Sequence, residues 1–151
     1  MAYSVGDYNA LSAHAEPCGK HQGAAVQPSL LCSLQNHPRI KRIWHPFSET
    51  NPTHEMAFHL LDDYTPLLYL ELDATSEQTK EVIDSFELAT QGVHLGTCHT
   101  MVTLCEETTH GVLTPEERTL AGIVPNGIRI SVGMEDPGAI VLDVINALNS
   151  I

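Results

Sequence analysis

Apolar and polar residues alternate with a period of two in two short segments, which predicts two half-buried β-strands. In residues 67–72 the even positions are all leucine, whereas Glu71 lies on the opposite face. In residues 128–132 the even positions are again apolar, so Arg129 and Ser131 are expected to point away from the core. Shorter β-rich stretches predict further strands at residues 40–44, around 93–95 and at 101–104.

Helix signals lie between and after these strands. Thr75 and Gln78 have the spacing of a capping box, in which each residue satisfies a free backbone amide of the other. Thr114-Pro115-Glu116-Glu117 has the same spacing with Pro at the first helical position, and Gly122 marks the end of that helix. Asp136-Pro137 opens the last helix, which carries one apolar stripe (Ile140, Val141, Val144, Ile145 and Leu148).

Two more helices are expected in the first half of the chain. Pro28 is expected to begin one of them, and His37-Pro38 to end it. The other is expected at about residues 54–61, with Met56, Leu60 and Leu61 on its inner side.

The order of these elements predicts an α+β fold with a small, mostly antiparallel sheet and helices packed on one face. Residues 28–151 are expected to form this single domain. Residues 1–27 are rich in Gly, Ala, Ser and His without a sustained period, which predicts a loosely ordered lead-in.

The charge and composition of the chain exclude several classes of binding partner and indicate a cellular location. The formal net charge of −12 argues against binding to nucleic acid or to an anionic membrane surface. No apolar run approaches the ~18 residues of a membrane span, and the first residues lack the basic and apolar pattern of a signal peptide. We therefore expect a cytoplasmic protein whose four cysteines are reduced thiols, with Cys98 and Cys105 buried as small apolar groups.

Histidine and cysteine supply metal-ligand chemistry without a metal-binding pattern. His54 and His59 are five residues apart, so on a helix their side chains diverge by about 140°, whereas zinc-binding helices place two histidines four apart. A second group has ligand chemistry at spacings that match no closed zinc site (His94, Cys98, His99 and Cys105). No metal site is predicted from these residues, although a His/Cys metal-binding protein remains one alternative. A nucleophilic site built from Cys or Ser with His also stays open, although the chain has no nucleophile-elbow motif.

Arg129 is one of only seven basic residues and lies on the non-core face of a predicted strand. A guanidinium on a rigid strand is well suited to bind a carboxylate through two parallel hydrogen bonds. An ordinary ion pair with one of the many acidic residues is an equal alternative.

The pattern Arg-x-Ser-x-Gly-x-Glu-Asp at residues 129–136 is the most specific motif of the chain. It follows Leu-Thr-Pro-Glu-Glu-Arg at 113–118, and shorter matches precede it at His37-Pro38, at Thr-His-Glu-Met-Ala in residues 53–57 and at Thr109-His110. In this order, from about residue 30 to the end, the chain resembles the C-terminal end of the Cys/Met metabolism family of pyridoxal-phosphate enzymes. That family includes cystathionine γ-synthase, cystathionine γ-lyase, methionine γ-lyase and the homoserine sulfhydrylases.

The resemblance implies the C-terminal domain of a fold-type I enzyme and a role for two residues in substrate binding. Arg129 matches the arginine that binds the α-carboxylate of a sulfur amino acid. The family's Ser-Leu-Gly-Gly segment corresponds to residues 94–97, where His94 replaces the serine and Thr97 the second glycine. His94 is therefore the second candidate substrate-binding residue, in a pocket that differs from the family pattern.

The same resemblance implies pyridoxal phosphate as cofactor, although the cofactor lysine of the family has no counterpart here. Lys20, Lys41 and Lys80 are the lysines of the chain, and none has the family's Ser-x-Thr-Lys context. We therefore expect a truncated or split member of this lyase and transferase family that has no activity alone and forms a homo-oligomer or binds a cofactor-domain chain. The alternative from another class is a non-catalytic module that docks on a pyridoxal-phosphate enzyme.

Overall fold

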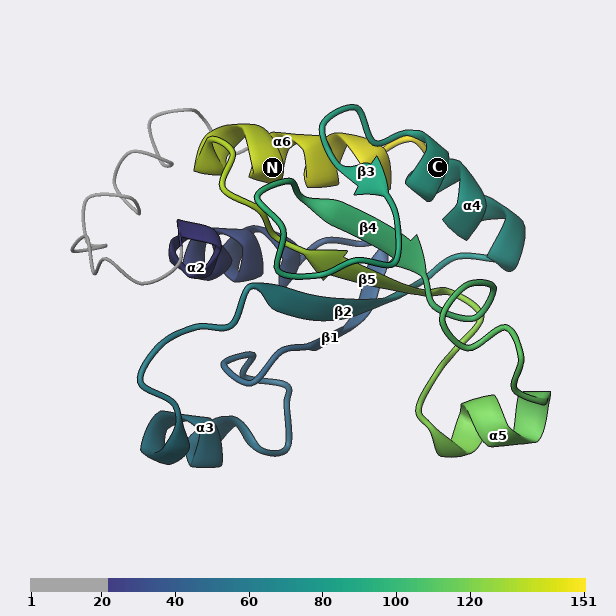
Figure 1. The fold of residues 1–151 in the computed structure, drawn as a ribbon, viewed down its shortest axis with the longest axis horizontal. Coiled ribbons are helices and arrows are strands. Elements are labelled where there is room, and N and C mark those ends of the chain that lie inside the picture. Colours follow the sequence, from purple (N-terminus) through teal and green to yellow (C-terminus); the bar gives the residue numbers. More distant parts are fainter. Residues whose placement is uncertain (1–21) are drawn as a thin grey trace.

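A computed structural model of the chain describes residues 22–151 and contains one five-stranded sheet (Figure 1). The strands are β1 (Ile40–Trp44), β2 (Leu67–Leu72), β3 (Thr90–Gln91), β4 (Met101–Leu104) and β5 (Gly127–Ser131), in the spatial order β1-β2-β5-β4-β3. All neighbouring pairs are antiparallel except β3 with β4, which is parallel. The predicted α+β fold with a mostly antiparallel sheet is confirmed.

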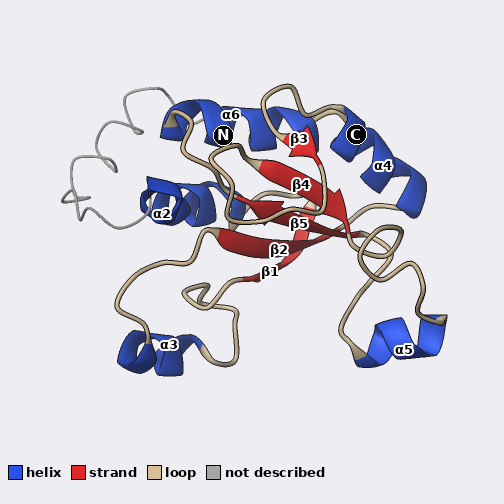
Figure 2. Ribbon diagram, viewed as in Figure 1, coloured by secondary structure: helices blue, strands red, loops and turns tan. Residues whose placement is uncertain are grey.

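Three helices, α2 (Gln22–Leu34), α4 (Ser76–Asp84) and α6 (Pro137–Leu148), pack on one face of this sheet. The two short helices, α3 (His54–Leu60) and α5 (Pro115–Leu120), stand apart from α4 and α6 (Figure 2). Among the described residues, no helix combines the length and the apolar character needed to cross a membrane.

The core lies between the sheet and these three helices because the alternating residues of the central strands face them. Leu68, Leu70 and Leu72 of β2 are buried, as are Ile128 and Ile130 of β5. The predicted stripe of α6 packs on them, with four of its five members buried and Ile145 partly buried. Both strands therefore turn their odd-numbered side chains to the opposite face of the sheet, which α2, α4 and α6 leave uncovered.

Both predicted capping boxes are present. The Thr75 and Thr114 hydroxyls accept the backbone N–H of Gln78 and Glu117, whose side chains in turn accept the N–H of each threonine. Gly122 follows α5 with φ +73°, a left-handed conformation that glycine adopts without strain. These ends were predictable because capping depends on neighbours in sequence alone.

Three expectations about the helices and strands are wrong. Helix α2 begins at Gln22, with Pro28 inside it, and Val26 and Gln27 are already buried. Residues 93–95 form no strand, because only Thr90–Gln91 pairs with β4 and the chain then leaves the sheet edge. Of the expected lead-in at residues 1–27, residues 22–27 belong to α2, and residues 1–21 lie outside the described residues.

The third correction concerns the face of α3. Met56 and Leu60 are 58% and 72% exposed, Leu61 is also exposed, and Ala57 is the buried residue of this helix. Apolar spacing identified a stripe, but it cannot tell whether the chain's own core covers that stripe. Here α3 lies away from the sheet, so the stripe faces outward.

Candidate functional site

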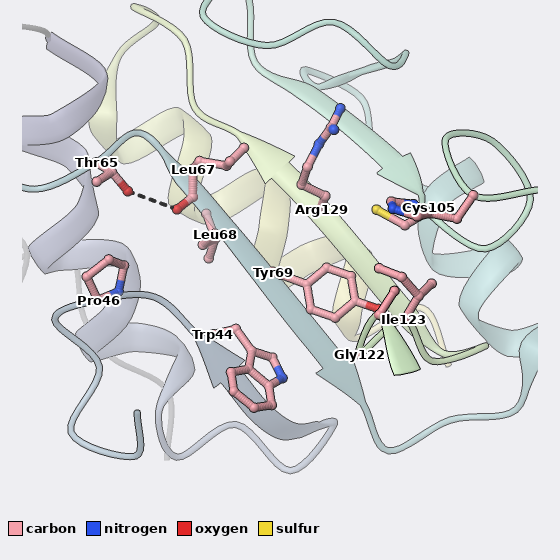
Figure 3. Close-up of a pocket in the computed structure, with 12 residues that line it drawn as sticks. Trp44, Pro46, Thr65, Leu67, Leu68, Tyr69, Cys105, Gly122, Ile123 and Arg129 are labelled. Carbon is pink, nitrogen blue, oxygen red and sulfur yellow. Dashed lines mark hydrogen bonds between the residues drawn. The ribbon is translucent and has the colours of Figure 1, made fainter. Parts of the chain in front are cut away.

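The uncovered face of the sheet carries Arg129 at its centre. Strand register pairs Arg129 with Tyr69 of β2 on one side and Thr103 of β4 on the other. Cross-strand partners share a face of the sheet, so these three side chains are neighbours. A cavity of about 630 Å³ lies beside them, walled mostly by apolar residues (Trp44, Pro46, Thr65, Leu67, Leu68, Tyr69, Cys105, His110, Ala121, Gly122, Ile123 and Arg129), as Figure 3 shows.

Arg129 is the only one of these twelve described lining residues with a permanent charge. Its Nη2 donates to the carbonyl of Val93 at 2.7 Å, and its Nε is buried without a hydrogen-bond partner. Within residues 22–151 no carboxylate lies within 4.0 Å of its guanidinium. The structure therefore leaves most donors of Arg129 without a protein partner in the described residues, beside a cavity whose other lining residues carry no permanent charge.

His94 lies in the loop of residues 92–100, which joins β3 to β4 and crosses the uncovered face (Figure 1). The loop contacts β5 twice, through Val93 and Arg129 and through the N–H of Gly96, which donates to the Ser131 hydroxyl at 3.2 Å. The side chain of His94 itself is exposed. Hydrogen bonds between the loop backbone and side chains of β5 therefore bring the segment of His94 next to Arg129, although the bonded residues are about 35 positions apart in sequence.

Tyr69 is a wall residue of the cavity that the sequence reasoning overlooked. Its hydroxyl accepts the backbone N–H of Val124 at 3.2 Å, and burial raises the pKa of its phenol. A side chain at Gly127 would collide with this hydroxyl, so glycine is required there. The alternation of residues 67–72 already placed Tyr69 on the face of Arg129, which is the signal that could have identified it.

Cys105 and His110 both line the cavity, but the thiol is poorly suited to act as a nucleophile. Burial raises the pKa of the Cys105 thiol, although a hydrogen bond with Thr109 and the charge of Arg129 oppose this effect. A thiol with a raised pKa is protonated and weakly reactive. Cys98, which was expected to be buried, is instead exposed in the loop.

No described residues form a metal site. Within residues 22–151, no three His, Cys, Asp or Glu side chains lie close enough together to hold an ion. The ring of His54 packs edge-on against Phe58 with centroids 4.9 Å apart.

His45 connects two chain segments that line the cavity. Its ring is buried, its Nδ1 accepts the N–H of Phe47 at 3.2 Å, and its Nε2 lies 3.1 Å from the carbonyl of Thr65. This arrangement requires the neutral ring with the proton on Nε2. Because Pro46 and Thr65 line the cavity, the neutral His45 connects the two chain segments on which they lie.

The free energy of unfolding is expected to decrease as the pH falls from about 7.5 to about 5. Burial lowers the pKa of His45 and also of His37, so between the folded and unfolded pKa values the unfolded chain binds more protons. This stabilising contribution is complete above the unfolded pKa and is lost on acidification through the folded pKa. Urea denaturation over this pH range should show a smaller pH dependence for His45→Gln. His59→Gln, at an exposed histidine, is the control and should keep the pH dependence of the parent chain. If the free energy of unfolding of His45→Gln depended on pH as in the parent chain, the contribution assigned to His45 would be contradicted.

The family model and the similar proteins of known name agree on one family. Residues 20–149 match the family model described as Cys/Met metabolism PLP-dependent enzyme. The chain is 34% identical to L-methionine gamma-lyase of Fusobacterium nucleatum subsp. polymorphum over 118 residues, which are 78% of this chain and 30% of that enzyme. It is 29% identical to cystathionine gamma-synthase of Escherichia coli (strain K12) over 117 residues, again 78% of this chain and 30% of that enzyme.

The fold agrees with these relatives. The crystal structure of cystathione gamma lyase (CalE6) from Micromonospora echinospora superposes with a TM-score of 0.79 at 28% identity, covering 85% of this chain and 34% of that one. The chain thus spans about 30% of the length of the curated relatives that it matches. Since the family model covers most of the chain, this protein belongs to the Cys/Met metabolism PLP-dependent enzyme family.

Proposed function

We propose that this chain provides the substrate-carboxylate side of an active site that acts on a sulfur amino acid, in the C–S lyase or γ-replacement class. The observation that carries the proposal is Arg129, which lines an apolar cavity and whose guanidinium has no carboxylate of residues 22–151 within 4.0 Å. A planar guanidinium with free donors binds a carboxylate through paired hydrogen bonds, and apolar walls suit a thioether side chain. The similarity to proteins named L-methionine gamma-lyase and cystathionine gamma-synthase supports the same substrate class.

The described residues do not fit a covalent site for pyridoxal phosphate. A Schiff base requires a neutral lysine amine facing the cavity. Lys41 and Lys80 each lie 2.6 Å from a glutamate oxygen, and neither lines the cavity of Arg129. The hydrogen bond to Glu107 raises the pKa of Lys80, which keeps its amine protonated. Our proposal therefore places the cofactor lysine outside residues 22–151, and we expect no turnover from the described domain by itself.

A titration with two matched ligands tests the proposal. L-Methionine is expected to shift the backbone NMR signals of Val93 and Gly96, which adjoin Arg129, whereas L-methioninamide lacks the carboxylate. A hydrogen bond to a charged group contributes about 1.5–3 kcal/mol, so the amide should bind roughly tenfold to a hundredfold more weakly. Equal affinity for the two ligands would contradict carboxylate recognition by this chain.

A second candidate function is a module that docks on a cofactor-containing chain, as a homo-oligomer or as one part of a split enzyme. It is favoured by exposed apolar residues on α3 and around α5 (Met56, Phe58, Leu60, Val112 and Leu120). Such surfaces are typical of interfaces between domains or subunits. Sedimentation at rising protein concentration distinguishes the docking module from the carboxylate-binding function. A docking module that forms homo-oligomers shows a rising molecular mass even where L-methionine produces no NMR shift.

A further inference from the structure

The loop of residues 92–100 is held by hydrogen bonds to β5 and to the residues that directly follow it. Arg129 and Ser131 contact the loop from β5, where residues two apart lie on the same face. Gly133 and Glu135, which follow β5, both bond Thr100 at the end of the loop. All four specified residues of the Arg-x-Ser-x-Gly-x-Glu motif therefore attach this loop.

Glu135 holds the end of the loop that leads into β4. One oxygen of its carboxylate accepts the backbone N–H of Thr100 at 2.6 Å, and the other accepts the Thr100 hydroxyl at 2.8 Å. The same hydroxyl accepts the N–H of Gly133 at 2.9 Å, and Thr100 is almost fully buried. Hydrogen bonds to a carboxylate are shorter and stronger than those between neutral groups, so Glu135 attaches this end of the loop by two strong hydrogen bonds.

The opposite end of the loop contacts the guanidinium. The Val93 carbonyl accepts from Nη2 of Arg129 at 2.7 Å, and no other hydrogen bond to the Arg129 side chain is made within residues 22–151. An arginine side chain has several rotatable bonds, and ordering it when a ligand binds costs free energy. A loop that is already fixed in place holds the guanidinium in one orientation before the ligand arrives.

We propose that Glu135 is a positioning residue for carboxylate binding, acting through Thr100 and residues 92–100 on the orientation of Arg129. The proposal rests on the proposed function, because it concerns how the carboxylate site is held in its binding geometry. Glu135 does not contact the ligand. Its effect passes through the loop to the Val93 carbonyl.

The test compares Glu135→Gln with the control Glu81→Gln. Both variants lose one negative charge, but Glu81 is exposed on α4, and its carboxylate makes no hydrogen bond or ion pair within residues 22–151. In Glu135→Gln the amide hydrogens of Gly96 and Thr100 are expected to exchange at least about tenfold faster. Its affinity for L-methionine is expected to fall about tenfold. Both quantities should stay at the parent value in Glu81→Gln.

A second pair of variants covers the case in which Glu135→Gln does not fold. Thr100→Val removes the hydroxyl that bonds both Glu135 and Gly133 and should weaken binding, whereas Thr100→Ser keeps it and should bind like the parent chain. Faster exchange with unchanged affinity, or no change in either quantity, would overturn the proposal.

The order of the Arg129 side chain separates this proposal from the proposed function. If the parent chain binds no L-methionine, the proposed function fails, and the NMR relaxation of the Arg129 Nε–H group becomes the deciding measurement. A rigid Nε–H in the parent chain that becomes mobile in Glu135→Gln would still support the positioning role. Equal order in both chains would overturn it.

Discussion

Arg129→Gln is expected to bind L-methionine at least about 30-fold more weakly than the parent chain, a loss of about 2 kcal/mol. Glutamine has no positive charge and one donor group in place of five N–H donors. Arg129→Lys retains the charge but not the planar pair of donors, so an intermediate loss of about tenfold is expected. Titration by NMR or calorimetry measures all three affinities.

Two controls make this result specific to the cavity. Arg39→Gln removes a positive charge from the connection between α2 and β1, which does not line the cavity, and should leave the affinity unchanged. The free energy of unfolding of Arg129→Gln should remain within about 1 kcal/mol of the parent value, because only the bond to Val93 is lost. A similar loss of affinity in Arg39→Gln would show that net charge, and not the position of Arg129, governs binding.

Gly133→Ala is expected to lower the free energy of unfolding by about 2–3 kcal/mol. A Cβ at this position would lie 2.5 Å from the Thr100 nitrogen and 2.6 Å from the Cys98 carbonyl oxygen. Both are backbone atoms, so the loop would have to move away from β5 to make room. Urea denaturation measures the loss, and faster amide exchange at Gly96 would locate it in the loop.

Gly138 in the first turn of α6 is the matched control. Alanine has a higher helix propensity than glycine, so Gly138→Ala is expected to leave stability unchanged or to raise it by up to about 1 kcal/mol. If Gly133→Ala were as stable as the parent chain, the close approach of the loop to this glycine would not be essential to the fold.

The predicted fold and the candidate site depended on different kinds of sequence information. Strands β2 and β5 were predictable because residue alternation and burial on one face are the same pattern. The face of Arg129 followed directly from that alternation. The contact between Arg129 and Val93 did not, because it joins residues 36 apart and depends on the route of an irregular loop.

The failures at α2 and α3 have related causes. Pro28 favours the first turn of a helix, but α2 already includes the residues before it, where Val26 and Gln27 are buried. The stripe of α3 is apolar as predicted, but it is exposed because the core of the described residues does not cover it. Both outcomes depend on which other segments of the chain lie against the helix, and local preference does not contain that information.

The sequence by itself determined the α+β class, the capped starts of α4, α5 and α6, and the side of β5 that carries Arg129. Each of these depends on residues at most a few positions apart, whose spacing alone defines a face or a helix end. Only the tertiary structure decided that Arg129 meets no carboxylate of residues 22–151, that Tyr69 forms a wall beside it, and that Glu135 holds the loop above it. These contacts join distant segments, and which segments meet depends on how the whole sheet and its helices pack together.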